Sequence, residues 1–295
     1  MNKKQVERVS KYHAVQVSEH LLDVVEQELP QALSDEETVY VMVDGSMILT
    51  REDEPDQADS VPDDTATEQK SEWKEVKLAR VFSSKSIYCV NSKRNWIKDS
   101  VYVGHLGKHT DFLHKLSAYT DQYDQNMVFV NDGATWIWNW IETHYPSAVQ
   151  ILDYYHAVSY LTTFAQNMFS QQGEQKQWVK QQEALLWEDG VEQVISHIED
   201  FKVNSKKQKQ AQHKILTYYK NNAKRMRYGT FKQQGYLVGS GAIESAHRTV
   251  VQKRMKLSGQ RWTKAGAQKI LDLRMAYLNK QWHKVIQSVN GKLAA

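Results

Sequence analysis

The chain has 295 residues, of which 41% are hydrophobic and 25% charged, so it can bury a core as one large domain or two of ordinary size. Its one cysteine, Cys89, excludes an intrachain disulfide and a cysteine-based zinc site, and it indicates the reducing cytoplasm. No apolar run approaches the roughly 20 residues that span a membrane, so we expect a cytoplasmic protein with no membrane partner.

Patterning in the first half of the chain predicts strands and helices of a mixed α/β domain. The β-branched run Val39–Val43 is typical of a strand buried on both faces, and we expect Asp44 to stand at its end. The other expected elements are a helix over 5–30, strands over 73–82 (antiparallel to the first) and 100–106, a helix over 111–123, a strand over 127–130, a helix over 134–144 and a strand over 148–152.

The second half is helical in pattern. A long helix is expected to open at His156, and residues 157–225 are helical with breaks near Gly173 and Gly190. A glycine-marked passage then precedes the helix that carries Glu244, and a last helix covers about 263–282. This order predicts parallel crossovers that place helices on the faces of a sheet.

Charge is distributed unevenly along the chain, although the formal net charge is only +3. Residues 51–70 carry eight acids and two basic residues, which predicts a mobile acidic loop over 51–71. Residues 202–264 carry 16 Lys or Arg and one acid, Glu244. A surface that binds polyanions ordinarily excludes a carboxylate unless a cation separates it from the phosphates. The segment therefore indicates nucleic-acid binding, with a merely solvated helix face as the alternative for 202–232.

Three acids follow or lie on the expected elements at positions suited to metal binding: Asp44 after the first strand, Asp132 after the fourth, and Glu244 after the helical block. The carboxyl ends of adjacent strands are where α/β sheets gather functional groups. Three converging carboxylates would repel one another unless divalent cations were bound, and such hard oxygen ligands suit Mg²⁺ or Mn²⁺. Two ions roughly 4 Å apart would activate the attacking oxygen and stabilise the leaving oxygen of a phosphoryl displacement. The pattern predicts a two-metal site that cuts or joins DNA.

Each of these acids also has a simpler interpretation. Asp44-Gly45 and Asp132-Gly133 are turn dipeptides, although the continuous apolar runs before them favour buried strands over hairpins. Glu244 can be a capping acid at a helix start, although its spacing from the preceding serine departs from that of a capping box.

Two further groups of residues are candidates around this site. Asp153 and His156, three residues apart, either face the site or serve as a helix N-cap and an ordinary histidine. Arg248 and Gln252 follow Glu244 by four and eight residues, which predicts one helical face that meets phosphate or base edges. The basic track continues with Lys253, Arg254, Lys256 and Arg261.

Five stretches in order resemble the bacterial insertion-sequence transposases of the DDE type, and most closely their Kra-type family. The resemblance covers about residues 38–285, and the ordered set is more specific than any single motif. The stretches are Val43-Asp44-Gly45-Ser46, Val130-Asn131-Asp132-Gly133-Ala134, Leu152-Asp153-Tyr154-Tyr155-His156-Ala157, Gly239-Ser240-Gly241-Ala242-Ile243-Glu244-Ser245 and Arg261-Trp262-Thr263-Lys264-Ala265-Gly266-Ala267.

The resemblance implies a ribonuclease H-like fold, a mixed sheet flanked by helices, with an all-helical insertion domain before the catalytic glutamate. It implies that Asp44, Asp132 and Glu244 are catalytic and hold two Mg²⁺ ions, with Asp153 and His156 beside the site. The implied partners are double-stranded DNA, as transposon ends and target, and further copies of the chain on that DNA. The implied location is the bacterial cytoplasm, at the nucleoid when DNA is bound.

The expected organisation is a helical lead-in over 1–37 that is the remnant of an amino-terminal region, a core over 38–156, a helical insertion over 157–235, and the rest of the core over 236–295. The predicted function is metal-dependent cleavage at transposon ends, followed by strand transfer into target DNA. The alternatives are an inactive or truncated DNA-binding remnant, and a nuclease of the same fold that does not join strands.

Overall fold

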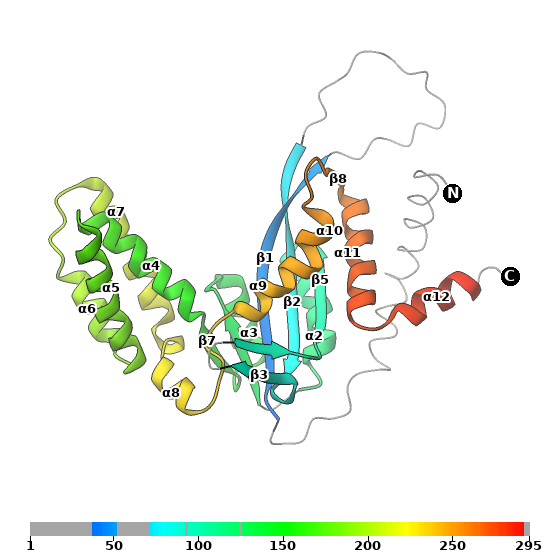
Figure 1. Ribbon diagram of the computed structural model, residues 1–295, viewed down its shortest axis with the longest axis horizontal. Helices are drawn as coiled ribbons and strands as arrows, with labels where there is room; N and C mark the ends of the chain where they lie inside the picture. Colours follow the sequence, from blue (N-terminus) through cyan, green and yellow to red (C-terminus); the bar gives the residue numbers. More distant parts are fainter. Residues whose placement is uncertain (1–36, 52–70, 92–93, 124–125, 292–295) are drawn as a thin grey trace, which may run out of the picture. The chain divides into compact units, whose positions relative to one another are not determined.

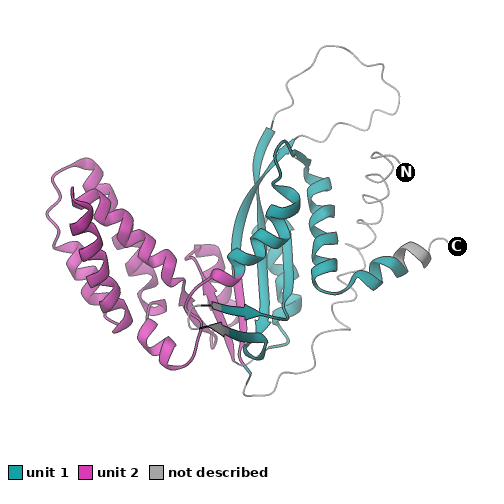
Figure 2. Cartoon of the chain, viewed as in Figure 1, with its two compact units in different colours: residues 1–37, 43–124, 243–295 teal, residues 38–42, 125–242 magenta. Residues whose placement is uncertain are grey.

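The computed structural model describes all residues except 1–36, 52–70, 92–93, 124–125 and 292–295. The chain forms two compact units (Figure 2). Unit 1 contains residues 1–37, 43–124 and 243–295, and unit 2 contains residues 38–42 and 125–242. The predicted lead-in helix over 5–30 and nearly all of the acidic loop over 51–71 lie outside the described residues.

Unit 2 begins with three parallel strands. The start of β1 (Val39–Arg51) pairs with β6 (Met127–Asn131), and β6 pairs with β7 (Val149–Leu152). Every residue of β6 is buried, as its continuous apolar run predicts for a strand covered on both faces. The helix α3 (Thr135–His144) follows β6, and Trp140 packs edge-on against Phe129 with ring centroids 5.9 Å apart.

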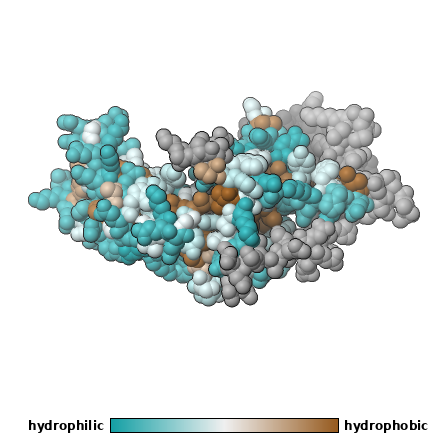
Figure 3. All heavy atoms as spheres, turned by 60° about the horizontal axis from the view of Figure 1, so that its bottom comes forward, coloured by the Kyte–Doolittle hydropathy of each residue, from teal (hydrophilic) through white to brown (hydrophobic). Residues whose placement is uncertain are grey.

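The rest of unit 2 is helical, as the sequence predicts for residues 157–225. Helix α4 packs against α5 and α7, and α6 packs against α5 and α7 (Figure 1). On the face drawn in Figure 3, hydrophilic residues cover most of these helices. The helices are α4 (Tyr154–Met168), α5 (Gln172–Trp187), α6 (Val191–Glu199), α7 (Lys206–Asn222) and the short α8 (Tyr228–Gln233).

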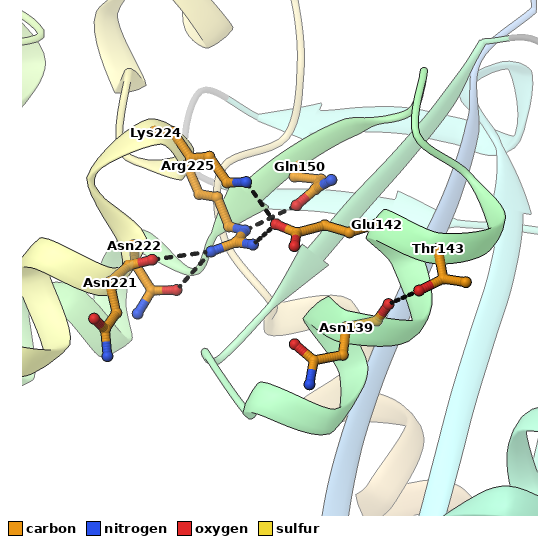
Figure 4. A network of polar contacts seen from close by, with 8 residues as sticks. All are labelled: Asn139, Glu142, Thr143, Gln150, Asn221, Asn222, Lys224 and Arg225. Carbon is orange, nitrogen blue, oxygen red and sulfur yellow. Dashed lines mark hydrogen bonds and ion pairs between the residues drawn. The ribbon is translucent and has the colours of Figure 1, made fainter.

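A polar network ties the end of α7 to α3 and β7 within unit 2 (Figure 4). Arg225 is 4% exposed and donates to Glu142 on α3, Gln150 on β7 and Asn222 at the end of α7. Its guanidinium also lies 4.4 Å from the centre of the Trp138 ring. The helices therefore share one compact unit with the three parallel strands.

Unit 1 contains the continuation of β1 from Val43 and two strands beside it. Hydrogen bonds join the strands in the order β5-β2-β1-β6-β7, and β1 belongs to both units. β2 (Ser71–Ser83) pairs antiparallel with β5 (Val101–Leu106), and β8 (Trp262–Thr263) pairs with the end of β1. Helices α2 (His109–Thr120) and α11 (Lys264–Leu278) pack against β5, which gives a mixed sheet flanked by helices.

The C-terminal part of unit 1 carries the segment around Glu244. Helix α9 (Gly241–His247) continues into a π-helical turn over Arg248–Gln252 and then into α10 (Lys253–Met255). Helix α12 (Trp282–Gly291) ends the described chain. Buried Ile243, Val250 and Val251 alternate with exposed polar residues, so one side of this segment packs and the other faces solvent.

Several predicted boundaries were wrong. β1 does not end at Asp44 but runs through Asp44-Gly45 to Arg51, so this dipeptide is not a turn. Helix α4 begins at Tyr154 rather than at His156, but the breaks predicted near Gly173 and Gly190 are confirmed, because they separate α4 from α5 and α5 from α6. A separate hairpin of β3 (Ile87–Asn91) and β4 (Arg94–Ile97) was not predicted, nor was the break between α6 and α7.

No helix in the described part of the chain has the length and the apolar character that crossing a membrane requires.

Candidate functional site

Asp132 and Asp153 lie at matching positions on two neighbouring parallel strands of unit 2. The register pairs Asn131 with Leu152, and each acid is the residue that directly follows its strand. The backbone N–H of Asp153 donates to the carbonyl of Asn131 at 2.8 Å. Both acids therefore stand at the carboxyl edge of the parallel strands, where the sequence places them.

Asp132 is held in a tight connection between β6 and α3. Its side-chain Oδ1 accepts a hydrogen bond from the N–H of Ala134 at 3.3 Å, and its backbone carbonyl accepts one from the hydroxyl of Tyr218 at 2.8 Å. Gly133 has a φ of +102°, a conformation that disfavours side chains with a Cβ. The side chain of Asp132 is half-buried, so its second oxygen can reach a ligand.

Asp153 is buried, and the protein uses both of its carboxylate oxygens. Oδ1 accepts from the N–H of Tyr155 at 3.0 Å, and Oδ2 accepts from the hydroxyl of Ser240 at 2.5 Å. The helix-cap interpretation of Asp153 is thus confirmed. His156 lies beside two tyrosine rings, 5.7 Å from Tyr160 and 6.2 Å from Tyr218 by ring centroids.

Asp44 lies within β1 in unit 1, beside a buried histidine. Its Oδ1 accepts from the N–H of Gly45 at 2.7 Å, and its Oδ2 lies 3.6 Å from Nε2 of His247. Burial lowers the pKa of His247 to about 4, and a hydrogen bond from the imidazole to the backbone of Asp44 opposes this only in part. His247 is therefore uncharged near neutral pH, and the 3.6 Å approach becomes an ion pair only in acid.

Glu244 lies in the first turn of α9 with an exposed side chain. This is also the position that a capping acid occupies. The two residues that sequence reasoning overlooked, His247 and Ser240, lie in the same stretch as Glu244. The sequence could have indicated these two residues only by their closeness to Glu244. Their partners, Asp44 and Asp153, are distant in sequence.

The predicted DNA-binding residues are all exposed on unit 1. Lys256 also donates to the hydroxyl of Ser46 on β1 at 2.6 Å. The expectation that Arg248 and Gln252 continue the face of Glu244 assumed a regular α-helix, and the π-helical turn adds one residue to each turn. The exposed residues are Arg248, Gln252, Lys253, Arg254, Lys256 and Arg261.

The candidate acids belong to different units: Asp44 and Glu244 to unit 1, and Asp132 and Asp153 to unit 2. Among the described residues, no three or more His, Cys, Asp or Glu side chains are grouped so that they could hold a metal ion. The chemistry of Asp44, Asp132 and Glu244 suits Mg²⁺, because carboxylate oxygens are the ligands it prefers. Asp153 suits it less well, because it is only 3% exposed and each of its oxygens already accepts a hydrogen bond.

Comparison with known proteins does not assign a family, because no protein-family model matches the chain and no curated protein matches it significantly.

Proposed function

We propose that the chain is the catalytic region of a DNA transposase. In this proposal Asp44, Asp132 and Glu244 hold two divalent ions, which would supply an activated attacking oxygen and stabilise the leaving oxygen of the cleaved strand. The chain would cleave at transposon ends and then transfer the freed strand end into target DNA.

The observation that carries the proposal is the register of the parallel strands. Val39 pairs with Met127, a separation of 88 residues (127 − 39). Asp44 and Asp132 have the same separation of 88 residues (132 − 44), and each lies three residues beyond a paired position on its strand. Two carboxylates that serve the same ions at the edge of a parallel sheet are expected to be separated in sequence by as many residues as the paired positions of their strands.

The surroundings of Glu244 give further support. Glu244 is exposed and is the one acid among the 16 Lys and Arg of residues 202–264. The exposed basic side chains that follow it would bind phosphates and so bring the DNA backbone towards the acids.

The direct test is strand cleavage and joining with Mg²⁺ on DNA that carries the element's end sequences. Asp44→Asn, Asp132→Asn and Glu244→Gln remove one negative ligand each with little change in shape, and each should lower cleavage by at least about a hundredfold. Glu174→Gln is the matched control, because Glu174 is likewise an exposed acid in the first turn of a helix. Full activity in any of the three variants would overturn the assignment of that residue.

The same assay separates the alternatives. A DNA-binding remnant would bind the DNA in a salt-dependent manner but cleave nothing when Mg²⁺ or Mn²⁺ is titrated. A nuclease of the same fold would cleave, including branched or hybrid substrates, but would not join the product to target DNA. Either result would replace the transposase proposal.

A further inference from the structure

Asp153 and Ser240 are joined by a buried hydrogen bond between residues 87 positions apart. Asp153 is 3% exposed and Ser240 is 7% exposed. The acceptor is a carboxylate, and a hydrogen bond to a charged acceptor is stronger than one between neutral groups. A buried carboxylate without such donors would be costly, so the bond is part of what keeps Asp153 in place.

The segment before Ser240 is fixed at consecutive residues within unit 2. The N–H of Leu237 donates to the hydroxyl of Tyr40 at 3.2 Å, and the carbonyl of Val238 accepts from the N–H of Tyr154 at 2.9 Å. Gly239 lies so close to the ring of Tyr155 that a Cβ at this position would come within 2.7 Å of it. The chain returning from the helices is therefore bound to the start of α4 before α9 begins.

We propose that Asp153 and Ser240 form a latch that sets where α9 begins and so determines where Glu244 is presented. This inference rests on the proposed function for the role of Glu244. Ser240 directly precedes Gly241, the first residue of α9, and Glu244 lies in the first turn of that helix. Asp153 is then a positioning residue that acts through Ser240, and it is not a metal ligand.

The arrangement of donors distinguishes the latch from a metal site. At Asp153 each carboxylate oxygen already accepts a hydrogen bond, from Ser240 or from Tyr155, and the residue is only 3% exposed, so it offers a metal ion little access. Asp132, at the matching position on β6, is half-buried and has a single side-chain hydrogen bond from Ala134. The two neighbouring aspartates therefore have different tasks.

The first test is Ser240→Ala, which removes the hydroxyl and leaves the backbone unchanged. We expect faster amide hydrogen exchange over residues 236–247, and about a tenfold rise in the Mg²⁺ concentration for half-maximal cleavage, the ratio that corresponds to losing about 1.4 kcal/mol. Thr230→Ala is the control, because the hydroxyl of Thr230 donates to a carboxylate, that of Asp189, at the same 2.5 Å. It should leave the Mg²⁺ dependence unchanged.

The second test is Asp153→Asn, which keeps an acceptor for Tyr155 and a polar partner for Ser240 but removes the charge. A latch predicts that this variant loses far less cleavage activity than Asp132→Asn, whereas a metal ligand predicts equal losses. The Asp153→Asn variant also tests the proposal if Ser240→Ala does not fold.

Hydrogen exchange separates failure of the latch from failure of the proposed function, because it needs no catalysis. Unchanged exchange over residues 236–247 in Ser240→Ala would overturn the latch even in an active enzyme. Faster exchange in a protein that cleaves no DNA with Mg²⁺ would support the bond as the anchor of α9 while overturning the transposase proposal. Equal losses of cleavage activity in Asp153→Asn and Asp132→Asn would show that Asp153 is a metal ligand and would overturn the latch.

Discussion

The hydroxyl group of Tyr218 donates a hydrogen bond to the backbone carbonyl of Asp132, and so joins helix α7 to the end of strand β6. Burial raises the pKa of Tyr218 well above its ordinary value, so the hydroxyl stays protonated and remains a donor. Its ring stacks on that of Tyr160 with centroids 3.9 Å apart. The position of Asp132 thus depends on the helical part of unit 2 as well as on its own strand.

The first prediction concerns Gly133, which packs against the Tyr218 ring. In Gly133→Ala the new Cβ would lie 2.9 Å from the Tyr218 ring. The ring cannot easily move, because its hydroxyl donates to Asp132 and its face stacks on Tyr160. The alanine would also have to keep the φ of +102°. We expect a loss of at least about 2 kcal/mol in the free energy of unfolding, measured by chemical denaturation.

Gly235→Ala is the control for Gly133→Ala. Gly235 has a φ of +80°, but nothing lies within 4 Å of its hypothetical Cβ. Its replacement by alanine should lower the free energy of unfolding by only about 1 kcal/mol, because the positive φ is the only strain. Equal losses in the two variants would show that the contact with Tyr218 does not restrain the end of β6.

The sequence predicted correctly those strands and helices whose structure is decided by their own residues. The runs Val39–Val43 and Met127–Val130 form buried strands because β-branched apolar residues must be covered on both faces. Most helices appeared because their apolar positions recur at helical spacing. The same local patterns also predicted that Asp132 and Asp153 each directly follow a strand, which the structure confirms.

Features decided by distant contacts were not predictable. Asp44-Gly45 has the composition of a turn, yet neighbouring strands keep it extended within β1. The bond between Asp153 and Ser240, and the approach of His247 to Asp44, join residues far apart in the chain. The π-helical turn after α9 departs from the regular spacing on which the face of Arg248 and Gln252 was predicted.

The second prediction concerns the network of Figure 4, in which two adjacent cations share one carboxylate oxygen. Arg225 and Lys224 both lie 2.5 Å from Oε1 of Glu142, but Arg225 has a 5% exposed side chain and that of Lys224 is 65% exposed. Arg225→Ala also loses the hydrogen bond to Gln150 and the contact with the Trp138 ring. It should therefore lower the free energy of unfolding by about 2 kcal/mol or more.

Lys224→Ala is the matched control for Arg225→Ala, because an exposed ion pair contributes little, on the order of 0.5 kcal/mol. Chemical denaturation of both variants is the measurement. Hydrogen exchange should also locate the effect of Arg225→Ala at the end of α7 and in β7. Similar losses in the two variants would contradict the view that burial gives Arg225 its importance.

The third prediction concerns the pH dependence of stability through His105 on β5. Burial lowers the pKa of His105 to about 4 from an ordinary 6.5, with Lys115 and Lys77 adding to the effect and Asp111 opposing it. Between these two pH values the unfolded chain binds the proton and the folded one does not. Stability is therefore complete above pH 6.5 and falls towards pH 4, by at most about 3 kcal/mol for this group.

The measurement is the free energy of unfolding at several pH values between 4 and 7. His105→Gln removes the titrating group, so the variant should lose less stability on acidification than the unaltered protein. His114→Gln replaces an exposed histidine on α2 of the same unit and is the control. Parallel pH profiles for His105→Gln and the unaltered protein would refute the prediction.

The last prediction concerns the exposed basic residues that follow Glu244. If they bind phosphates, DNA affinity should fall linearly on a plot of log affinity against log salt, and Arg254→Ala should reduce that slope by about 0.9. Gln252→Ala, an exposed uncharged neighbour, should leave the slope unchanged. Arg254 is exposed, so its replacement by alanine should leave the fold intact. An unchanged slope in Arg254→Ala would mean that this side chain contacts no phosphate.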